Sequence, residues 1–402
     1  MIRSIGSERM RRTGAAIFAE VAAWKAEAVR AGLDVIDLSI GSPDRPPSER
    51  VRRKLAEAVM RPDAYGYPSS QGSTAFRRTA ARWMKHRFGV ELDPDSEIVA
   101  LMGSQDGLAH AAVALTDPGD PVLVPDPGYP IYTAGVILAG AVPVHVPLRP
   151  ENGFLPDLAA IPDEVRKRAR YMLLNYPGNP LSVVADESFF RHWLAFSEET
   201  GIPLLHDLAY SEMAFDGIRP KSLLELPGAI ERAAEFHSLS KSFNMAGCRI
   251  GFLAGNREIV AALKSVKSNV DYGVFGPIQE AAIEALEEDM EGASEPVAPL
   301  YERRRNVLVA ALREGGWIFD PPQATMFLWA PVPEGWTSRQ ISREILENTG
   351  VAVVPGDAFG PLGEGCVRIA LVQEEERLAE AGRRLARFWR ERIIDRGMPG
   401  GR

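Results

Sequence analysis

Short apolar runs alternate with helical patterns along most of the chain from residue 98 onward. Runs of this length are typical of strands buried on both faces, and the stretches between them carry apolar residues at helical spacing. This order predicts βαβ units and an α/β fold with a buried, mostly parallel sheet. The predicted strands of the sheet lie at 98–102, 121–124, 170–174, 202–205, 234–239 and 249–254.

The two ends of the chain differ from this alternating region. The first part predicts a helix at 15–31, a strand at 35–40, and helices at 48–60, with Ser48 as the N-cap, and at 74–88. Helices dominate 256–315, after which strands at 325–329, 351–354 and 366–370 and a long arginine-rich amphipathic helix indicate a smaller α+β unit. We therefore predict a large domain at 46–290 and a small domain that combines 1–45 with 291–402.

Composition narrows the class of protein. Hydrophobic residues make up 46% and charged residues 25% of the 402 residues, which argues against disorder and fibres. The formal charge of −8 gives no basic field for nucleic acid or anionic membranes. Two cysteines, Cys248 and Cys366, argue against a disulfide framework or a structural zinc site. The N-terminus resembles an amphipathic helix more than a signal peptide, and no apolar run reaches membrane-spanning length, so we expect a cytoplasmic protein.

Polar residues follow four of the predicted strands, at the ends where parallel sheets bind their ligands. They are Gly103, Ser104 and Gln105 after the first strand, Asn175 and Asn179 after the third, His206, Asp207 and Tyr210 after the fourth, and Ser238 and Lys241 after the fifth. Because such strand ends meet at one edge of the sheet, we expect these groups to converge on one crevice. They would supply an amine, a carboxylate, a phenol, an amide and several hydroxyl or backbone donors.

Lys241 is one of eight lysines, and it alone follows directly on a buried-strand pattern. Burial lowers the pKa of an amine and prepares it for Schiff-base chemistry, although a lysine paired with a carboxylate at the sheet edge is an equal alternative on residue type alone. Asp207 suits a pyridinium nitrogen, and taken alone it equally suits a metal ion or a helix N-cap. A metal site is disfavoured because the adjacent His206 and Asp207 point to opposite sides of a strand.

The Gly103-Ser104-Gln105 run opens a predicted helix directly after a strand. Small residues there let backbone N–H groups approach a phosphate at the positive end of the helix. The run matches neither the dinucleotide-binding nor the P-loop glycine motif, so an ordinary tight turn remains the alternative.

Over nearly its whole length the chain resembles the class I/II aminotransferases, which have fold type I and depend on pyridoxal 5'-phosphate. The lysine motif, Ser238-Leu-Ser-Lys241-Ser-Phe-Asn-Met-Ala-Gly-Cys-Arg249, carries the resemblance, and the other anchors recur in family order. The resemblance implies that Lys241 forms the Schiff base with the cofactor and moves the proton in catalysis. It also implies that Asp207 pairs with the pyridine nitrogen of that cofactor.

The same resemblance assigns roles to the remaining residues. Tyr210 and Asn179 would bind the 3' oxygen of the cofactor, and Tyr129 would stack on its ring. The phosphate would be held by Gly103, Ser104, Gln105, Ser238 and Arg249. Gly41, Asn179 and Arg368 would bind the substrate, with the arginine holding its carboxylate bidentately. Tyr67 would reach the phosphate of a partner subunit, which implies a homodimer with shared active sites.

The sequence departs from the family pattern at two positions. Leu181 and Ser182 follow Asn179-Pro180 where the family usually has threonine and glycine, which puts the turn behind the asparagine in doubt. Cys248 stands where a bulky residue is common, and we expect it to act as a small hydrophobic side chain.

The implied reaction is transamination in amino-acid metabolism, between an L-amino acid and a 2-oxo acid such as 2-oxoglutarate. Segments 206–217, 271–275 and 355–360 are most similar to the LL-diaminopimelate and alanine aminotransferase-like branch. LL-diaminopimelate is therefore the first expected donor, with alanine or another neutral amino acid next. A carbon–sulfur β-lyase would keep the same cofactor anchors and remains an alternative.

Two readings from other classes have weaker support. Ser238-x-x-Lys241 fits the motif of penicillin-binding serine acyltransferases, but no Lys-Thr-Gly follows and no export signal is expected. A non-catalytic sensor that uses the same fold would carry an added DNA-binding region. About 35 residues before the first predicted strand leave no room for one.

Overall fold

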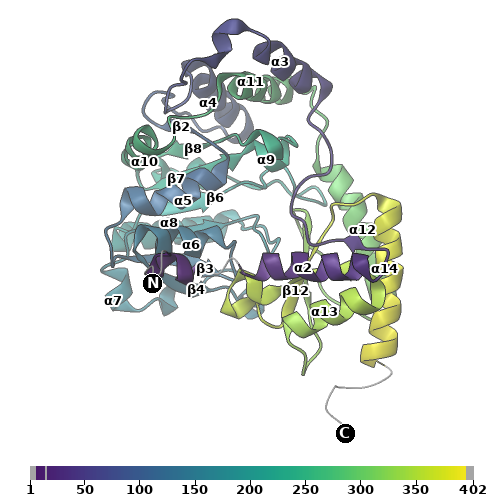
Figure 1. The fold of residues 1–402 in the computed structure, drawn as a ribbon. Coiled ribbons are helices and arrows are strands. Elements are labelled where there is room, and N and C mark those ends of the chain that lie inside the picture. The colour runs from purple at the N-terminus through teal and green to yellow at the C-terminus, as the bar shows by residue number, and fades with distance from the viewer. Residues whose placement is uncertain (1–5, 14–15, 395–402) are drawn as a thin grey trace, which may run out of the picture.

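The computed structural model describes residues 6–13 and 16–394 of the chain. A seven-stranded sheet forms the centre of the larger of two bodies (Figure 1), with the order β2-β8-β7-β6-β5-β3-β4. β8 is antiparallel to both of its neighbours, and the other pairs of this sheet are parallel, so the mostly parallel sheet is confirmed. The strands are β2 (Ile98–Leu101), β3 (Pro121–Asp126), β4 (Val142–Pro147), β5 (Met172–Asn175), β6 (Leu204–Asp207), β7 (Ala233–Ser238) and β8 (Gly251–Gly255).

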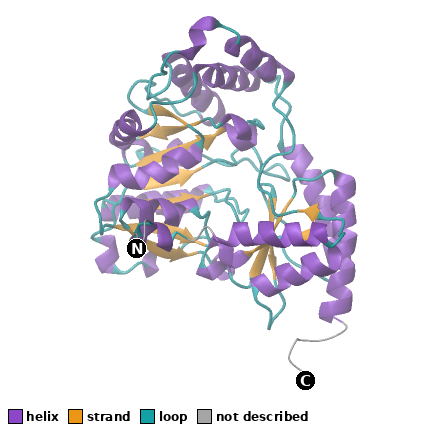
Figure 2. Cartoon of the chain, viewed as in Figure 1, coloured by secondary structure: helices purple, strands orange, loops and turns teal. Residues whose placement is uncertain are grey.

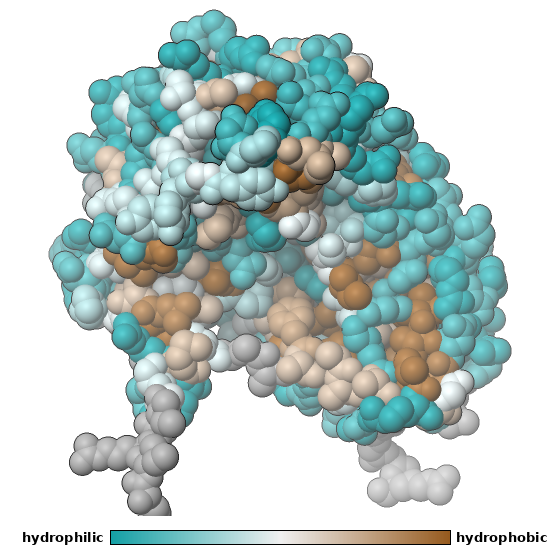
Figure 3. Space-filling model, turned by 45° about the horizontal axis from the view of Figure 1, so that its top comes forward, coloured by the Kyte–Doolittle hydropathy of each residue, from teal (hydrophilic) through white to brown (hydrophobic). Residues whose placement is uncertain are grey.

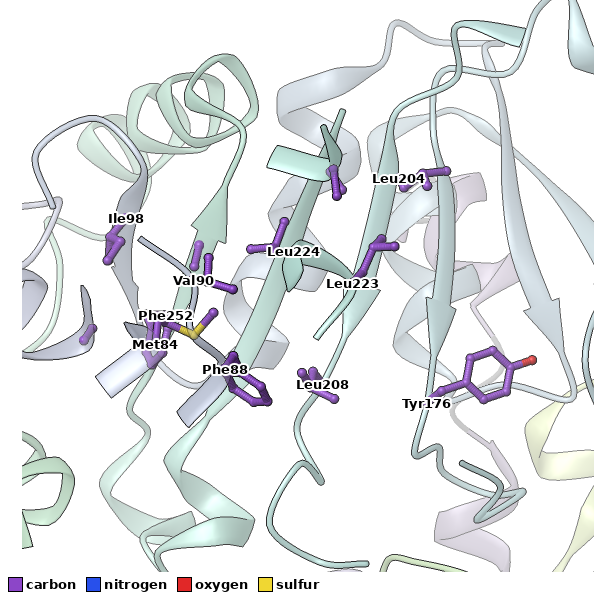
Figure 4. Packing of buried hydrophobic residues seen from close by; sticks show 14 of the residues in the cluster. Met84, Phe88, Val90, Ile98, Tyr176, Leu204, Leu208, Leu223, Leu224 and Phe252 are labelled. Atoms are coloured by element: carbon purple, nitrogen blue, oxygen red, sulfur yellow. The ribbon is translucent and has the colours of Figure 1, made fainter. Parts of the chain in front are cut away.

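Helices cover both faces of this sheet, because alternate side chains of a strand point to opposite sides. Val99 and Leu101 of β2 belong to one core with residues of α5 (Ser104–Leu115), α6 (Ile131–Ala139) and α10 (Arg257–Val270). Ile98 and Ala100 belong to the opposite core with residues of α4 (Thr74–Phe88), α8 (Glu187–Thr200) and α11 (Gly276–Met290). Figure 4 shows part of that second core, where Met84 and Phe88 lie close to Phe252. Burial on both faces explains the unbroken apolar runs in the sequence.

The smaller body, drawn beside the first in Figure 2, contains an antiparallel sheet of order β11-β12-β9 and a parallel pair, β1-β10. Its strands are β1 (Ile36–Asp37), β9 (Phe327–Pro331), β10 (Val351–Ala352), β11 (Val354–Pro355) and β12 (Cys366–Ala370). Its helices are α2 (Ala16–Arg30), α12 (Ala298–Glu314), α13 (Ser338–Thr349) and α14 (Glu375–Phe388), followed by a π-helical segment, Trp389–Ile394. The predicted domain bounds, 46–290 and 1–45 with 291–402, stay a prediction.

The remaining α-helices of the described residues are α1 (Glu8–Arg12), α3 (Glu49–Val59), α7 (Asp163–Arg166) and α9 (Leu239–Ser242), and short 3-10 turns connect other elements. Ser48 caps α3 as predicted, since its hydroxyl accepts a hydrogen bond from the backbone N–H of Val51. Across the described residues, each helix is too short or too polar to cross a membrane.

The structure differs from the predicted strands most clearly in five places. β4 was not predicted, because this edge strand is largely exposed and carries Pro143 and Pro147, so it lacks an apolar run. β6 continues past residue 205, since His206 is fully buried and contacts the Glu235 carboxylate at 2.8 Å. The strand predicted at 249–254 starts at Gly251, because Arg249 adopts a left-handed φ of 53°. The strands at 35–40 and 351–354 shorten to two-residue pairings.

Candidate functional site

A cavity of about 890 Å³ lies where the ends of β5, β6 and β7 face the smaller body. Figure 3 shows the molecule hollowed between the two bodies on the face it presents. The predicted site residues that line the cavity are Gly41, Ser104, Gln105, Tyr129, Asn179, Asp207, Tyr210, Ser238, Lys241, Arg249 and Arg368. Side chains from strand ends far apart in the sequence therefore do meet in one crevice.

The turn before α5 and Arg249 form a cradle of hydrogen-bond donors. Gly103 has a φ of 73° and precedes the helix whose first residues are Ser104 and Gln105. A Cβ on Gly103 would lie 2.5 Å from Nη2 of Arg249, so a side chain at this position would displace the guanidinium. The free N–H groups of a helix start and a guanidinium together suit a phosphate. Ser238 stands beside this cradle, and its hydroxyl accepts a hydrogen bond from Ser240 N at 3.2 Å.

Lys241 projects from α9 into the cavity, partly buried. Its Nζ donates a hydrogen bond to the carbonyl oxygen of Gly41, and no salt bridge among the described residues includes it. The alternative of a lysine paired with a carboxylate is therefore not what the described residues show. Burial, together with the charges of Arg368 and Arg249, lowers the pKa of Lys241 to about 8. A substantial part of this amine is therefore neutral, and nucleophilic, in mildly basic solution.

Asp207 ends β6 and is 4% exposed. Its Oδ2 accepts a hydrogen bond of 2.8 Å from the hydroxyl of Tyr132, and its Oδ1 accepts one of 3.3 Å from Ala209 N. Asn175 supports the same strand end, since its Nδ2 donates to the Asp207 carbonyl oxygen at 2.6 Å. Burial raises the pKa of Asp207, and the hydrogen bond from Tyr132 opposes that rise. Because the described residues provide no salt-bridge partner, this carboxylate is available to a cationic ligand atom.

Arg368 on β12 is a buried guanidinium held in a fixed plane. Its Nη1 donates to Asn179 Oδ1 and its Nη2 to the Ser39 carbonyl oxygen, both at 3.0 Å, while its Nε has no partner among the described residues. The rings of Phe327 and Phe359 lie 4.2 and 4.8 Å from its Cζ. Burial lowers the pKa of Arg368 to about 10. A fixed guanidinium without a carboxylate partner suits bidentate binding of a carboxylate ligand.

Gly41 lies against this arginine. A Cβ there would lie 3.0 Å from the Phe327 ring and 3.8 Å from Nη1 of Arg368. The small residue therefore keeps the approach to the guanidinium open, as the predicted role in substrate binding requires.

The three predicted tyrosines occupy different environments. Tyr129 donates a hydrogen bond of 2.9 Å to Gln105 Oε1, and Tyr210 is buried in the wall of the cavity. Burial raises the pKa of both phenols, so both stay protonated hydrogen-bond donors at neutral pH. Tyr67 lies away from the cavity and is 93% exposed, with its ring 5.8 Å from that of Tyr272. Its predicted contact with a partner subunit stays a prediction.

The turn after Asn179 forms although Leu181 and Ser182 stand where the family usually has threonine and glycine. Ser182 takes the left-handed conformation, with a φ of 59°, that glycine adopts most easily. Its hydroxyl bonds to Thr325 Oγ1 at 2.6 Å and to the Phe327 carbonyl oxygen at 2.9 Å. These bonds anchor the turn to the smaller body. Cys248 is partly buried against the core on one side of the sheet, as expected of a small hydrophobic side chain.

One cluster of potential metal ligands lies behind the cradle, formed by Asp106, His110 and Asp271. The amine of Lys267 stands 2.6 Å from the Asp106 carboxylate and 2.7 Å from that of Asp271. Both carboxylates therefore already have a cationic partner within the chain.

Sequence reasoning missed several residues that shape the site, namely Tyr132, Phe327 and Phe359 as contacts of the predicted groups, and Lys25 in the cavity wall, whereas Asn175 was among the expected strand-end groups. Tyr132 had a usable signal, because it lies three residues after Tyr129, a spacing that brings two rings together where a helix begins. Phe327 and Phe359 had no such signal, since aromatic residues in apolar runs are typical of the hydrophobic core.

Comparison with known proteins gives one consistent result. Residues 33–385 match the model of the family described as aminotransferase class I and II. The chain is 46% identical to the LL-diaminopimelate aminotransferase of Desulforudis audaxviator, over 95% of this chain and 97% of that protein. It is 44% identical to the enzyme of the same name from Halothermothrix orenii, over 94% and 97%.

Solved structures agree with these relatives. Substrate-bound BacF from Bacillus subtilis superposes with a TM-score of 0.91 at 36% identity, covering 96% of this chain and 98% of that one. A probable N-succinyldiaminopimelate aminotransferase from Thermus thermophilus has a TM-score of 0.86 at 41% identity, covering 92% and 99%.

Proposed function

This chain belongs to the class I and II aminotransferases, and on that premise we propose that it moves the amino group of LL-diaminopimelate to a 2-oxo acid such as 2-oxoglutarate. The protein is an aminotransferase with the fold-type I architecture. Pyridoxal 5'-phosphate is the proposed cofactor. The partly buried amine of Lys241, free of any carboxylate among the described residues and in the same cavity as Asp207, is the observation that carries the chemistry.

The residues present fit that cofactor. Gly103 leaves room for Arg249 beside the start of α5, which makes a cradle for a phosphate. Asp207 is a buried carboxylate without a salt-bridge partner in the described residues, which suits a protonated pyridine nitrogen. Tyr129, Asn179 and Tyr210 line the space between these two groups. They would stack on the ring and bind its oxygen.

Each residue has a definite task in the reaction. When bound, the cofactor supplies an electron sink for the carbanion formed at the substrate's Cα. The amine of Lys241 removes the proton from that Cα, a task that suits its lowered pKa. The negative charge of Asp207 would keep the pyridine nitrogen of the bound cofactor protonated, which the electron sink requires. Arg368 fixes the substrate's α-carboxylate and thereby the orientation of the Cα–H bond.

The choice of donor is supported by the relatives' names and by the size of the site. The cavity of about 890 Å³ is in the size range that holds a cofactor together with a donor longer than alanine, and Lys25, paired with Asp37 at 2.6 Å, adds a cation to its wall. Alanine or another neutral amino acid is the next candidate.

The test is the visible absorbance of the holoenzyme on addition of LL-diaminopimelate, alanine, aspartate and cystathionine in turn. LL-diaminopimelate should bleach the yellow band, and 2-oxoglutarate should restore it. A band bleached by alanine alone would change the donor and keep the reaction. Release of pyruvate from cystathionine, without bleaching by the other amino acids, would replace the proposal with a β-lyase.

We further propose that the enzyme works as a cytoplasmic homodimer in which each Tyr67 serves the partner's site. The exposure of this aromatic side chain, beside the partly exposed ring of Tyr272, supports such a contact. Sedimentation at assay concentration should show a dimer, and a fully active monomer would contradict the proposal.

A further inference from the structure

Tyr132 is held in an unusual position for a buried tyrosine. It lies in the first turn of α6, is 3% exposed, and donates its hydroxyl to Oδ2 of Asp207 at 2.8 Å. Of the described side chains, it alone donates a hydrogen bond to this carboxylate. The backbone N–H of Ala209 adds a longer contact of 3.3 Å to the other oxygen.

We propose that Tyr132 is a positioning residue that keeps Asp207 ionised and fixed for the pyridine nitrogen of the cofactor. This inference rests on the proposed function. Tyr132 would act on the reaction only through Asp207, and no contact between Tyr132 and the substrate is assigned.

The hydroxyl can act only as a donor here. Burial raises the pKa of Tyr132 far above its ordinary value, so the phenol stays protonated at every working pH. A neutral donor favours the charged form of its carboxylate partner, whereas burial favours the neutral form. Without Tyr132, the effect of burial on the pKa of Asp207 would be opposed mainly by the nearby His206, and then by the longer backbone contact and by His237.

Other titratable groups around Asp207 cannot replace this contact. Tyr129 and Tyr210 face the carboxylate as phenols whose pKa is itself raised by burial. His206 on β6 is turned to the opposite side, where it contacts Glu235 and the Tyr176 carbonyl oxygen. His237 on β7 stacks on Phe252 at 4.8 Å and makes no hydrogen bond to Asp207.

One turn of α6 serves two parts of the site. Tyr129, just before this helix, donates to Gln105 at the cradle, and Tyr132 donates to Asp207. The two rings meet edge to face, 5.9 Å apart. Residues 129–132 thus contact both the residues proposed to bind the phosphate of the cofactor and the carboxylate proposed to bind its nitrogen.

The test compares Tyr132→Phe, Asp207→Asn and the double variant with the wild type. Tyr171→Phe is the matched control, because Tyr171 is buried in the same core as Tyr132 but does not line the cavity. The readouts are the dissociation constant of pyridoxal 5'-phosphate from pH 6 to 9 and the pH midpoint of the visible band. Thermal melting of the cofactor-free proteins reports on folding.

Tyr132→Phe should bind the cofactor more weakly, by up to about tenfold at the acidic end of this pH range and by less as the pH rises, since a hydrogen bond to a charged group is worth about one pKa unit. The substitution should have no further effect in the Asp207→Asn background. Equal effects of Tyr132→Phe in both backgrounds, or equal behaviour of Tyr132→Phe and Tyr171→Phe, would overturn the inference alone. A wild-type protein that binds no pyridoxal 5'-phosphate would overturn the proposed function with it.

Discussion

The titration of Lys241 gives a prediction about stability at the scale of one residue. Its pKa falls from the ordinary 10.5 to about 8 on folding, because burial and neighbouring arginines disfavour the ammonium. The unfolded chain therefore holds more protons than the folded one between these two values, and stability must rise with pH in that window. In cofactor-free protein, Lys241→Met should add on the order of 3 kcal/mol to the free energy of unfolding at pH 7. The gain should disappear as pH rises from about 8 to 10.5.

Urea unfolding of the cofactor-free proteins at pH 7, 9 and 10 measures this difference. The exposed Lys85, paired with Glu91 on the surface, provides the control as Lys85→Met. Surface substitutions change stability by less than about 0.5 kcal/mol. If Lys241→Met raised the free energy of unfolding by the same amount at all three pH values, the lowered pKa of Lys241 would be contradicted.

Arg368 yields a kinetic prediction at the same scale. Arg368→Lys keeps the positive charge but loses the planar fork that two carboxylate oxygens require. We expect kcat/KM to fall about 10- to 100-fold for the donor and for the 2-oxo acid alike, through KM. Affinity for pyridoxal 5'-phosphate should change far less, because Arg368 lies outside the cradle formed by Gly103 and Arg249 and reaches the proposed cofactor residues only through Asn179. Equilibrium dialysis of the cofactor separates the two effects, and loss of cofactor with KM unchanged would refute the assignment.

At the scale of elements, one buried amine joins α10 to α5 and to the loop after α10. Lys267 is fully buried between the carboxylates of Asp106 and Asp271, and Asp106 also accepts the backbone N–H of Met102 just before the cradle. Burial raises the pKa of Asp106, but His110 and Lys267 outweigh it and hold the pKa at about 2. Removing the amine therefore leaves Asp271 without a salt-bridge partner among the described residues and leaves Asp106 with His110 alone, in a poorly solvated place.

Lys267→Met should lower the free energy of unfolding by about 3–5 kcal/mol. Lys264→Met is the control, because Lys264 lies three residues earlier on the same helix and donates to the Asp95 carbonyl oxygen at the surface. Denaturant midpoints measure both. Equal midpoints for the two variants would show that the Asp106–Lys267–Asp271 contacts contribute nothing beyond an ordinary surface lysine.

The elements also show what the sequence could and could not predict. Strands covered on both faces were found, because double burial leaves a continuous apolar run, whereas the exposed edge strand β4 leaves none. The strand-end groups were found because their types are unusual beside a buried strand. The role of Arg368 in substrate binding could be predicted only from the family resemblance, since an arginine on a short strand usually forms an ordinary ion pair. The Tyr132–Asp207 bond spans 75 positions, and no local pattern encodes such a contact.

At the scale of the whole molecule, the cavity depends on both bodies and on both ends of the chain. Asp207 and Lys241 come from the larger body, and Arg368 comes from the smaller one. Phe18 and Lys25 of α2 close part of the wall. A substrate carboxylate bound to Arg368 would therefore lie between groups of the two bodies, in a cavity whose wall includes the helix α2.

The proposed sharing of Tyr67 between subunits leads to a complementation prediction. Tyr67→Ala and Lys241→Ala should each be nearly inactive as homodimers, the first for lack of a phosphate contact from the partner and the second for lack of the amine. In a hybrid dimer, the Lys241→Ala chain still offers its Tyr67 to the intact lysine of the other chain. Unfolding and refolding an equal mixture should therefore recover about a quarter of wild-type activity, since half of the dimers are hybrids with one complete site each. Differently tagged chains allow the hybrid to be isolated and assayed by itself. If Tyr67 acted within its own chain, the hybrid would hold no complete site and would stay as inactive as its parents.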